Sequence, residues 1–507
     1  MNNKEQQGKN MKKIDQDELL NTQFMESLQN EPMKNLISGE WVETPEIEEN
    51  INPSDTSDIV STFYKGSFSH IFETIDCASK GQADWAKSSI ALREQILTEI
   101  AEKLMANKDF YGEIIAREAG KPIKEATDEV VKSAEFFTYF AAESIRSKGA
   151  FMDSPRESVD IEVINEPVGV VGVITPWNYP LAIAAWKIAP ALAYGNSVIL
   201  KPSSQTPAIA YILAKIIDST KLPKGVFSLI YGKGGVIGKA LAESKKVQAI
   251  TFTGSVGAGK DLAKKSIDSM TKLQLEMGSK NSLIILDDAN LDIAVEAAIK
   301  GAYNANGQKC TSCSKLVVTE GIYEKFLDAY KAKMKTLTVG NAMDKSSNIG
   351  PCIDKKQLDS NLAYIKLGQE EGATLVCGGE AIKTETEGFF FSPALFVDGK
   401  SQMRINQEEM FGAIACVIKV KNYDEAIHVL NDTEFGLSGG IITNDLKKAM
   451  QFKHDAVIGN VMINLPTAGM DNHVPFGGRK NSSYGSREKS YAASDFYTTT
   501  KTVYIKY

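Results

Sequence analysis

The amino-acid sequence predicts an α/β fold built on two doubly wound parallel sheets. One observation is a change near residue 168, where a stretch of helical periodicity (83–146) gives way to short apolar, β-rich runs separated by helical segments. A second observation is the return of the same alternation across residues 283–465. Buried strands that alternate with helices form parallel sheets with helices on both faces. We therefore expect two such sheets in succession along the chain.

The first part of the chain predicts helices. Its apolar residues recur at the three- and four-residue spacing that places them on one helix face. They are Trp85, Ile90, Leu92, Ile96, Leu97, Ile100 and Leu104.

The first predicted sheet draws its strands from four apolar runs, with helical segments such as 181–193 and 207–219 between them. The runs lie at 169–174, 197–201, 225–231 and 249–253. Ligands of parallel sheets bind beyond the carboxyl ends of the strands. The segments at those ends are 175–178, 201–204, 232–238 and 254–259.

The second predicted sheet uses runs of the same kind, and two further segments are predicted to be half-buried strands. The runs lie at 282–286, 315–318, 414–420 and 458–464. Residues 156–166 and the tail 500–506 alternate polar and apolar side chains, as strands with one covered face do.

Composition is that of a globular enzyme. The chain has 507 residues, 43% of them apolar and 24% charged, enough for about three domains. Its net charge of −7 argues against nucleic acid as the main partner, because phosphate binding needs clustered cations. No apolar run reaches the length of a membrane span, and the first ten residues contain no signal-peptide core. Residues 1–34 are expected to form a polar N-terminal extension.

Six scattered cysteines do not make a disulfide framework, so a cytoplasmic, reducing compartment is expected. Cys310 and Cys313 do form a Cys-x-x-Cys motif. With only four histidines in the chain, a zinc site is disfavoured and no metal is expected. Our hypothesis is that oxidation can join these two cysteines reversibly and shield Cys310.

Three residues have the chemistry of covalent catalysis at a carbonyl group. The thiol of Cys310, in a polar segment poorly suited to a core, could add to a carbonyl carbon. Glu276 is expected at a strand end, where its carboxylate could activate water. Asn178 could donate to the resulting alkoxide together with the backbone N–H of Cys310. The alternatives are a core cysteine, a surface glutamate and a turn asparagine.

Seven ordered segments together resemble the aldehyde dehydrogenase superfamily, from about residue 35 to the end. They are 175–180, 201–207, 252–255, 275–280, 307–311, 408–412 and 475–478. The resemblance implies a Rossmann-like dinucleotide-binding domain (35–150 and 168–278), a catalytic domain (279–485) and an oligomerisation arm (151–167 and 486–507). In that arm 156–166 and 500–506 would pair and bind a neighbouring subunit, giving a homodimer or homotetramer.

The resemblance also assigns roles to individual positions. Cys310 would be the nucleophile, Glu276 the general base and Asn178 part of the oxyanion hole. Ser279 departs from the usual glycine and would restrict the backbone if its φ were positive. The expected cofactor-binding residues are Thr175, Pro176, Trp177, Lys201, Ser203, Ser204, Lys233, Gly234, Gly238, Phe252, Gly254, Ser255, Gly259, Glu409 and Phe411.

The cofactor prediction favours NADP, with NAD or dual use as the alternative. Many NAD-preferring members of the family place a glutamate where Ser204 stands, to bind the ribose 2′-hydroxyl. A serine removes the charge that would repel a 2′-phosphate, and Lys201 and Lys233 add positive charge. Lys233 could equally be an ordinary solvated lysine.

The segment 464–485 resembles the branch of the family that oxidises 2-oxoglutarate semialdehyde (2,5-dioxopentanoate). Such a substrate has a distal carboxylate, which needs a cation or several donors. Arg479 is a candidate, beside Phe476, although it could instead tie loops together. Succinate semialdehyde, or a broad range of aldehydes, is the alternative.

Three other classes of protein fit this sequence less well. A phosphate-loop ATPase is suggested by 254–261, but Asp261 stands where that motif has Ser or Thr. A CoA-acylating relative generally lacks the general base that Glu276 provides. A non-catalytic binding protein on the same fold is expected to have lost Cys310, Glu276 or Asn178.

Overall fold

The computed structural model describes residues 27–28, 30–146 and 149–507. Most of the N-terminal extension expected at 1–34 therefore lies outside the described residues. None of the helices in the described ranges combines the length and apolar character that crossing a membrane requires.

The first sheet contains eight strands in the part of the chain that the structure describes, and its five central strands are parallel. In spatial order the eight are β2 (Glu40–Val42), β1 (Asn35–Ile37), β9 (Phe227–Leu229), β8 (Ser197–Lys201), β7 (Val170–Ile174), β10 (Ala249–Thr253), β11 (Lys272–Glu276) and β21 (Ser483–Tyr484). The five parallel strands, β9 to β11, end at one edge. The loops that follow them are therefore neighbours in space.

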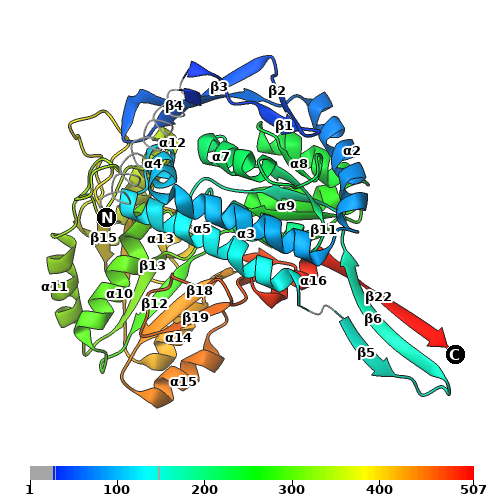
Figure 1. The fold of residues 1–507 in the computed structure, drawn as a ribbon. Coiled ribbons are helices and arrows are strands. Elements are labelled where there is room, and N and C mark those ends of the chain that lie inside the picture. The colour runs from blue at the N-terminus through cyan, green and yellow to red at the C-terminus, as the bar shows by residue number, and fades with distance from the viewer. Residues whose placement is uncertain (1–26, 29, 147–148) are drawn as a thin grey trace, which may run out of the picture.

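Helices connect the strands of this sheet and surround it (Figure 1). The connecting helices are α6 (Ala182–Ala193), α7 (Pro207–Asp218), α8 (Gly234–Glu243) and α9 (Val256–Ser266). The predicted helical stretch before the sheet forms α2 (Phe68–Trp85), α3 (Ile90–Ala106), α4 (Lys108–Ala119) and α5 (Ile123–Ser144). Helix α5 packs against α3, α4 and α6, and its buried face joins the largest apolar core.

The second sheet has seven strands within the described residues, and all its neighbours pair in parallel except an antiparallel edge strand. The order is β14 (Thr374–Cys377), β15 (Ala394–Val397), β16 (Ile414–Val420), β13 (Cys313–Thr319), β12 (Asn281–Ile285), β18 (Ser438–Ile442) and β19 (Asn460–Ile463). Two apolar clusters, one on each face, bury it between helices. This confirms the prediction of a doubly wound α/β fold with two mainly parallel sheets.

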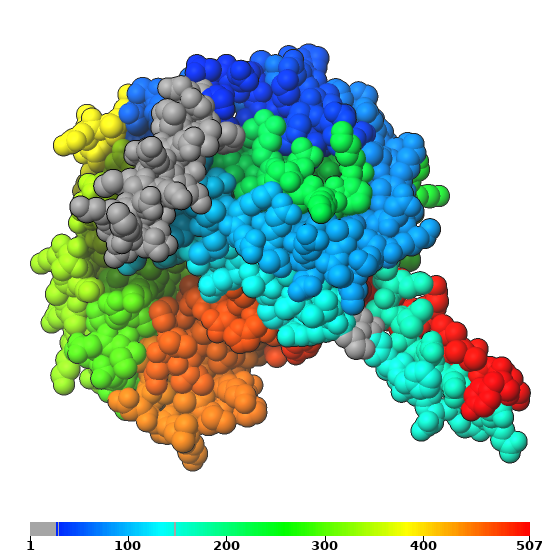
Figure 2. Space-filling model, viewed as in Figure 1, coloured from blue at the N-terminus to red at the C-terminus, as the bar shows by residue number. Residues whose placement is uncertain are grey.

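A small antiparallel sheet projects from the body (Figures 1 and 2). It consists of β5 (Gly149–Asp153), β6 (Val159–Pro167) and β22 (Thr498–Lys506), in the order β22-β6-β5. Strand β22 pairs with β6 along its full length, from Thr498 opposite Pro167 to Lys506 opposite Val159. The pairing expected between 156–166 and 500–506 is therefore confirmed.

Candidate active site

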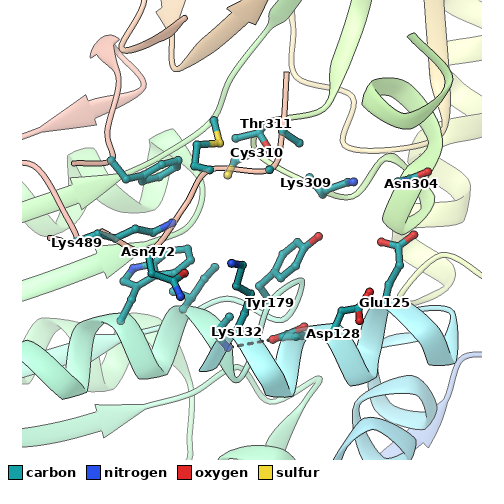
Figure 3. Close-up of a pocket in the computed structure, with 18 of the residues that line it drawn as sticks. Glu125, Asp128, Lys132, Tyr179, Asn304, Lys309, Cys310, Thr311, Asn472 and Lys489 are labelled. Carbon is teal, nitrogen blue, oxygen red and sulfur yellow. Dashed lines mark hydrogen bonds between the residues drawn. The ribbon is translucent and has the colours of Figure 1, made fainter. Parts of the chain in front are cut away.

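A cavity of about 410 Å³ lies between α5, α6 and the loop that carries Cys310. Figure 3 shows Cys310 and Lys309 on one side of it, and Glu125, Asp128 and Lys132 of α5 across from them. Residues 466–476 and Lys489 complete the lining. The cavity brings together segments that are up to about 360 positions apart in the sequence.

The loop before Cys310 is fixed in an unusual backbone conformation. Ala305 and Asn306 both have positive φ, 50° and 59°, in a short 3₁₀ turn (Asn304–Gly307) that ends α10 (Leu291–Tyr303). The side-chain amide of Asn306 donates to the carbonyls of Gly120 and Pro351, at 3.2 and 2.8 Å. Such conformations cost about 1–3 kcal/mol each and persist only where surrounding contacts hold them.

The carbonyl oxygen of Cys310 is fixed as well. It accepts hydrogen bonds from the hydroxyl of Ser279 and from Nδ2 of Asn281, the latter at 2.8 Å. Ser279 is not among the residues with positive φ, so its side chain introduces no backbone strain of that kind. Ser279, which stands where the family usually has glycine, thus contacts the main chain of Cys310.

Two N–H donors belong to or contact the loop that carries Cys310. Asn178 is buried, and its Nδ2 donates to the carbonyl of Gln308 at 3.0 Å, which leaves its second N–H for another acceptor. The backbone N–H of Cys310 donates to no group within the described ranges. This is the pair of donors that an oxyanion hole needs.

The thiol of Cys310 rests in its neutral form. Its pKa is raised to about 12, chiefly by burial and also by the nearby carboxyl groups of Glu276 and Glu409, while Lys489 acts in the opposite direction. A thiol with this pKa is a weak nucleophile until a base removes its proton.

Glu276 is the last residue of β11, as expected, and is almost fully buried. Its Oε2 accepts a hydrogen bond from Ser483 Oγ at 2.6 Å. Burial raises the pKa of this carboxyl well above its usual value, and the neighbouring Glu488 raises it further. A carboxyl group with a raised pKa suits a general base that must also bind the proton.

A buried polar cluster lies behind Glu276. The ammonium of Lys187, which is fully buried, forms an ion pair with Oε1 of Glu488 and donates to Thr251 Oγ1 at 2.8 Å. Burying an unpaired charge costs free energy, so the ion pair lowers the cost of burying both side chains. Glu488 was not predicted from the sequence, and no short motif identifies it.

The predicted cofactor residues gather at the carboxyl edge of the first sheet. Thr175 follows β7, Lys201 ends β8, and Lys233 precedes the first turn of α8. The backbone of α8 is open to solvent at Gly235, where a Cβ would meet nothing within 4 Å, and the same holds at Gly257 in α9. Open backbone at two helix N-termini fits the phosphates of a dinucleotide.

Two side chains at this edge fit the rest of such a cofactor. Thr175 Oγ1 is buried without a hydrogen-bond partner among the described residues. The Nζ of Lys201 lies 3.8 Å from the position of a Cβ on Gly234, and burial lowers its pKa to about 8. Both groups could donate to ribose hydroxyls or phosphate.

The remaining predicted cofactor residues of the first sheet fall into two groups. Phe252 lies in β10, Gly254 and Ser255 form the turn that follows it, and Gly259 lies in α9. Ser255 Oγ caps that helix by accepting from the Ala258 N–H at 3.4 Å. Pro176, Ser203, Ser204 and Gly238 lie on the neighbouring loops and on α8.

Glu409 and Phe411 lie in the loop before β16 of the second sheet and reach the same region. The Oε1 of Glu409 accepts from the Ser279 N–H at 2.9 Å, and burial raises the pKa of its carboxyl to about 7. The ring of Phe411, whose φ is 57°, packs edge-on against Trp177 with centroids 5.4 Å apart. Residues predicted from motifs more than 230 positions apart are thus neighbours.

The predicted substrate residues differ in where they lie. Phe476 lines the cavity, but Arg479 does not. Arg479 is exposed in β20 (Arg479–Lys480), which pairs with β17 (Phe435–Gly436), so its position supports the structural alternative. The lysines that do line the cavity are Lys132, Lys300, Lys309 and Lys489; none was predicted to bind substrate.

Cys313 lies at the start of β13 and is fully buried against Gly301. All six cysteines are free thiols in the structure. The proposed disulfide between Cys310 and Cys313 stays a prediction. No cluster of three or more potential metal ligands occurs within the described ranges.

Comparison with known proteins agrees with this geometry. Residues 41–503 match the model of the aldehyde dehydrogenase family. The chain is 38% identical over 476 residues to a Bacillus subtilis protein named alpha-ketoglutaric semialdehyde dehydrogenase, covering 93% of this chain and 98% of that one. It is 37% identical over 485 residues to the alpha-ketoglutarate semialdehyde dehydrogenase of Haloferax volcanii, covering 94% and 100%.

The fold also matches solved structures. Betaine aldehyde dehydrogenase from Staphylococcus aureus, solved in complex with NAD⁺, superimposes with a TM-score of 0.92 at 32% identity, over 95% of this chain and 96% of that one. Matches of this extent establish the enzyme class. The chain belongs to the aldehyde dehydrogenase family and is an NAD(P)-dependent aldehyde dehydrogenase.

Proposed function

We propose that this enzyme oxidises 2-oxoglutarate semialdehyde to 2-oxoglutarate through a covalent intermediate on Cys310. The observation that carries the mechanism is the surroundings of the buried Cys310 thiol. The backbone N–H of Cys310 is unpaired among the described residues, the carboxyl of Glu276 interacts with the thiol electrostatically, and Asn178 donates to the carbonyl of Gln308 in the same loop. Two observations support this choice of substrate. The two relatives described above are named as semialdehyde dehydrogenases, and lysines line the cavity.

The first step is addition of the Cys310 sulfur to the aldehyde carbon, while Glu276 takes the thiol proton and then releases it to solvent. The carbonyl oxygen becomes an alkoxide, which accepts hydrogen bonds from the Cys310 N–H and the second N–H of Asn178. When bound, the nicotinamide supplies the acceptor for the hydride that leaves the thiohemiacetal carbon. A thioester on Cys310 remains.

The second step is hydrolysis of that thioester. Glu276 takes a proton from a water molecule, whose oxygen adds to the thioester carbon. The carbon–sulfur bond then breaks, and the carboxylic acid leaves with the thiol of Cys310 restored. The sum is one aldehyde, one water and one oxidised cofactor giving one acid, one reduced cofactor and one proton.

The test of this mechanism is an absorbance assay at 340 nm with semialdehydes and either cofactor. Cys310→Ser is expected to lower kcat/KM by at least about 1,000-fold, since serine is a poorer nucleophile with a higher pKa. Mass spectrometry of the wild-type protein quenched during turnover should find the acyl group on the peptide that contains Cys310. Cys313→Ser, which makes the same change three residues later in the chain, is the control and should keep the activity.

Full turnover by Cys310→Ser would contradict the proposal. Turnover that requires CoA would instead place the enzyme among the acylating relatives. Faster oxidation of succinate semialdehyde than of 2-oxoglutarate semialdehyde would reassign the substrate but keep the mechanism.

We propose NADP as the favoured cofactor, because no carboxylate occupies position 204 and Lys201 lies close to the first turn of α8. Ser204→Glu is expected to shift the ratio of kcat/KM for NADP to that for NAD toward NAD by about tenfold or more, since it places a negative charge near the 2′-phosphate. Ser219→Glu, which makes the same change on an exposed residue at the opposite end of α7, is the control. An unchanged ratio in Ser204→Glu would contradict the assignment.

We also propose that the β arm joins subunits into a homodimer or homotetramer, and that the enzyme works in the cytoplasm. Exposed apolar side chains on the arm support the first proposal: Phe151 is 70% exposed and Tyr504 is 55% exposed. Six free cysteines support a reducing compartment.

A further inference from the structure

Lys489 occupies a box of aromatic rings inside the cavity. Its Nζ lies 4.4 Å from the ring centroid of Trp186, 4.7 Å from that of Phe476 and 5.2 Å from that of Phe136. Ammonium groups bind to aromatic faces at these distances, and boxes of this kind recognise ligands with quaternary ammonium groups. Here the chain supplies the cation itself.

The main chain holds Lys489 in this place. Phe476 and Glu488 exchange two backbone hydrogen bonds of 2.8 Å, which fixes the residue immediately before Lys489. Lys489 and Ser490 then both adopt positive φ, 63° and 52°. Neither is glycine, so the turn carries strain that surrounding contacts must offset. Strained residues of this kind concentrate where a side chain must be held in one position for function.

The charge of Lys489 is not neutralised by a partner. Its Nζ forms no hydrogen bond or ion pair with any residue in the described ranges, although the residue is only 5% exposed. The nearby Glu488 already pairs with Lys187 through Oε1. Burial lowers the pKa of Lys489 to about 8, while Glu488, Cys310 and Glu276 act to raise it. The group is therefore mainly an ammonium ion at pH 7.

The N–H donors of Lys489 face the open part of the cavity. Figure 3 shows the end of its side chain pointing inward, between Asn472 and the Cys310 loop. Lys489 and Cys310 line the same cavity and interact electrostatically. An aldehyde bound at Cys310 and extending a few carbons along the cavity would bring its distal group to this ammonium.

We propose that Lys489 is the residue that selects anionic aldehydes: its ammonium fills the aromatic box against cationic substrates and donates to the distal carboxylate of a semialdehyde. This proposal rests on the proposed function, and it gives Lys489 the role for which the sequence suggested Arg479. An uncharged aldehyde would bind without this contact, and a quaternary ammonium aldehyde would meet a like charge in the box.

Other cavity cations are less suited to this role. Lys132 and Lys300 each form a salt bridge of 3.0 Å with a glutamate on their own helix. Lys309 lies beside the carboxyl of Glu125, which raises its pKa against the lowering effect of burial. All three therefore carry a charge that is partly offset, whereas the ammonium of Lys489 faces aromatic rings and the cavity.

The experiment compares three aldehydes in the wild-type enzyme and in Lys489→Met, which keeps the apolar stem and removes the charge. The aldehydes are glutarate semialdehyde, butanal and betaine aldehyde, so the distal group is negative, neutral or positive. Loss of a charge-assisted contact predicts a fall of about 10- to 100-fold in kcat/KM for the semialdehyde. The value for butanal should stay within about threefold, and that for betaine aldehyde should rise.

Two variants serve as controls. Lys489→Arg keeps the charge and should keep the order semialdehyde, butanal, betaine aldehyde. Lys103→Met makes the same change at a salt-bridged lysine of α3 that does not line the cavity, and it should leave the ratio of semialdehyde to butanal within about threefold, since paired surface charges contribute little. Lys489→Gln, also neutral, gives a second measurement of the same ratio if Lys489→Met does not fold.

The outcomes separate the two proposals. A wild-type enzyme that oxidises none of the aldehydes would overturn the proposed function itself. A wild-type enzyme that oxidises all three without regard to charge would overturn only the role of Lys489. The same holds if the neutral variants keep the preference for the semialdehyde, or if they lose activity on butanal to the same extent.

Discussion

At the scale of single residues, the site separates the two tasks of the reaction by burial and charge. Cys310 has a pKa of about 12 and needs a base before it can add to a carbonyl. Glu276 has a raised pKa because it is buried beside Glu488. A carboxyl with a raised pKa is a stronger base, which suits taking a proton from a thiol or from water.

Replacing Glu276 by glutamine is expected to slow thioester hydrolysis more than the steps before it. The side chain keeps its size but can no longer accept a proton, which costs about 100- to 10,000-fold in the step it catalyses. Rapid mixing should show a burst of reduced cofactor, up to one equivalent per site, followed by slow turnover. The control is Glu434→Gln, which makes the same change at an exposed carboxyl that accepts a hydrogen bond from Asn481.

The pH dependence should follow the same carboxyl group. Only the ionised form of Glu276 can act as a base, and a pKa raised above its usual value moves ionisation to higher pH. The rate of hydrolysis in the wild-type enzyme should therefore fall as pH is lowered through that pKa. In Glu276→Gln this acidic limb should disappear. A limb that persists unchanged in the variant would assign it to another group.

At the scale of elements, a side chain of one helix can accept hydrogen bonds from the free N–H groups at the start of another helix. Helix α7 illustrates this, because its own N-terminal residue Thr206 makes no side-chain cap. Instead Glu118, from α4, accepts from the N–H groups of Ala208 and Ile209 at 2.6 and 3.0 Å. One helix thus satisfies the free donors at the start of another, beside the loop that holds Lys201 and Ser204.

Glu118→Ala is expected to lower stability markedly. Glu118 is fully buried, and its loss would leave two buried N–H groups unsatisfied, at about 1–3 kcal/mol each. Thermal denaturation followed by circular dichroism should show a lower midpoint. Glu113→Ala, the same change on an exposed residue of α4, is the control. Equal midpoints for the two variants would show that Glu118 does not cap α7.

At the scale of the whole molecule, the projecting sheet is the part that packs least against its own chain. Apolar side chains on it are exposed, and its outer strands have free edges among the described residues. Such edges are usually covered in stable proteins, because unpaired strand groups and exposed apolar surface favour association.

Phe151→Asp on the arm is expected to reduce the assembled mass. A charge placed on a covered apolar residue must be desolvated, which weakens association. Size-exclusion chromatography with light scattering measures the mass against 55.3 kDa for one chain. Met270→Asp, at a residue of the body that is 82% exposed, is the control and should leave the mass unchanged. A wild-type protein that runs as a monomer would contradict the assembly proposal.

Much of the site could be predicted because of how parallel sheets are built. Thr175, Lys201 and Glu276 each follow or end a strand of one sheet, and parallel strands end at one edge, so their order in the sequence suffices to group them. Arg479 is harder to place from the sequence. Arg479 directly follows the motif at 475–478. It lies in β20, which pairs with β17, and it does not line the cavity.

The sequence by itself determined the α/β class, the succession of two sheets and the enzyme class, and it singled out Cys310, Glu276 and Asn178 for the proposed chemistry, because periodicity and short motifs are local properties of the chain. Only the tertiary structure decided that Glu488 lies behind Glu276 and that Lys489 sits among three rings. Those arrangements depend on a C-terminal segment returning to helices α5 and α6, more than 300 positions earlier, and no local pattern records such a contact.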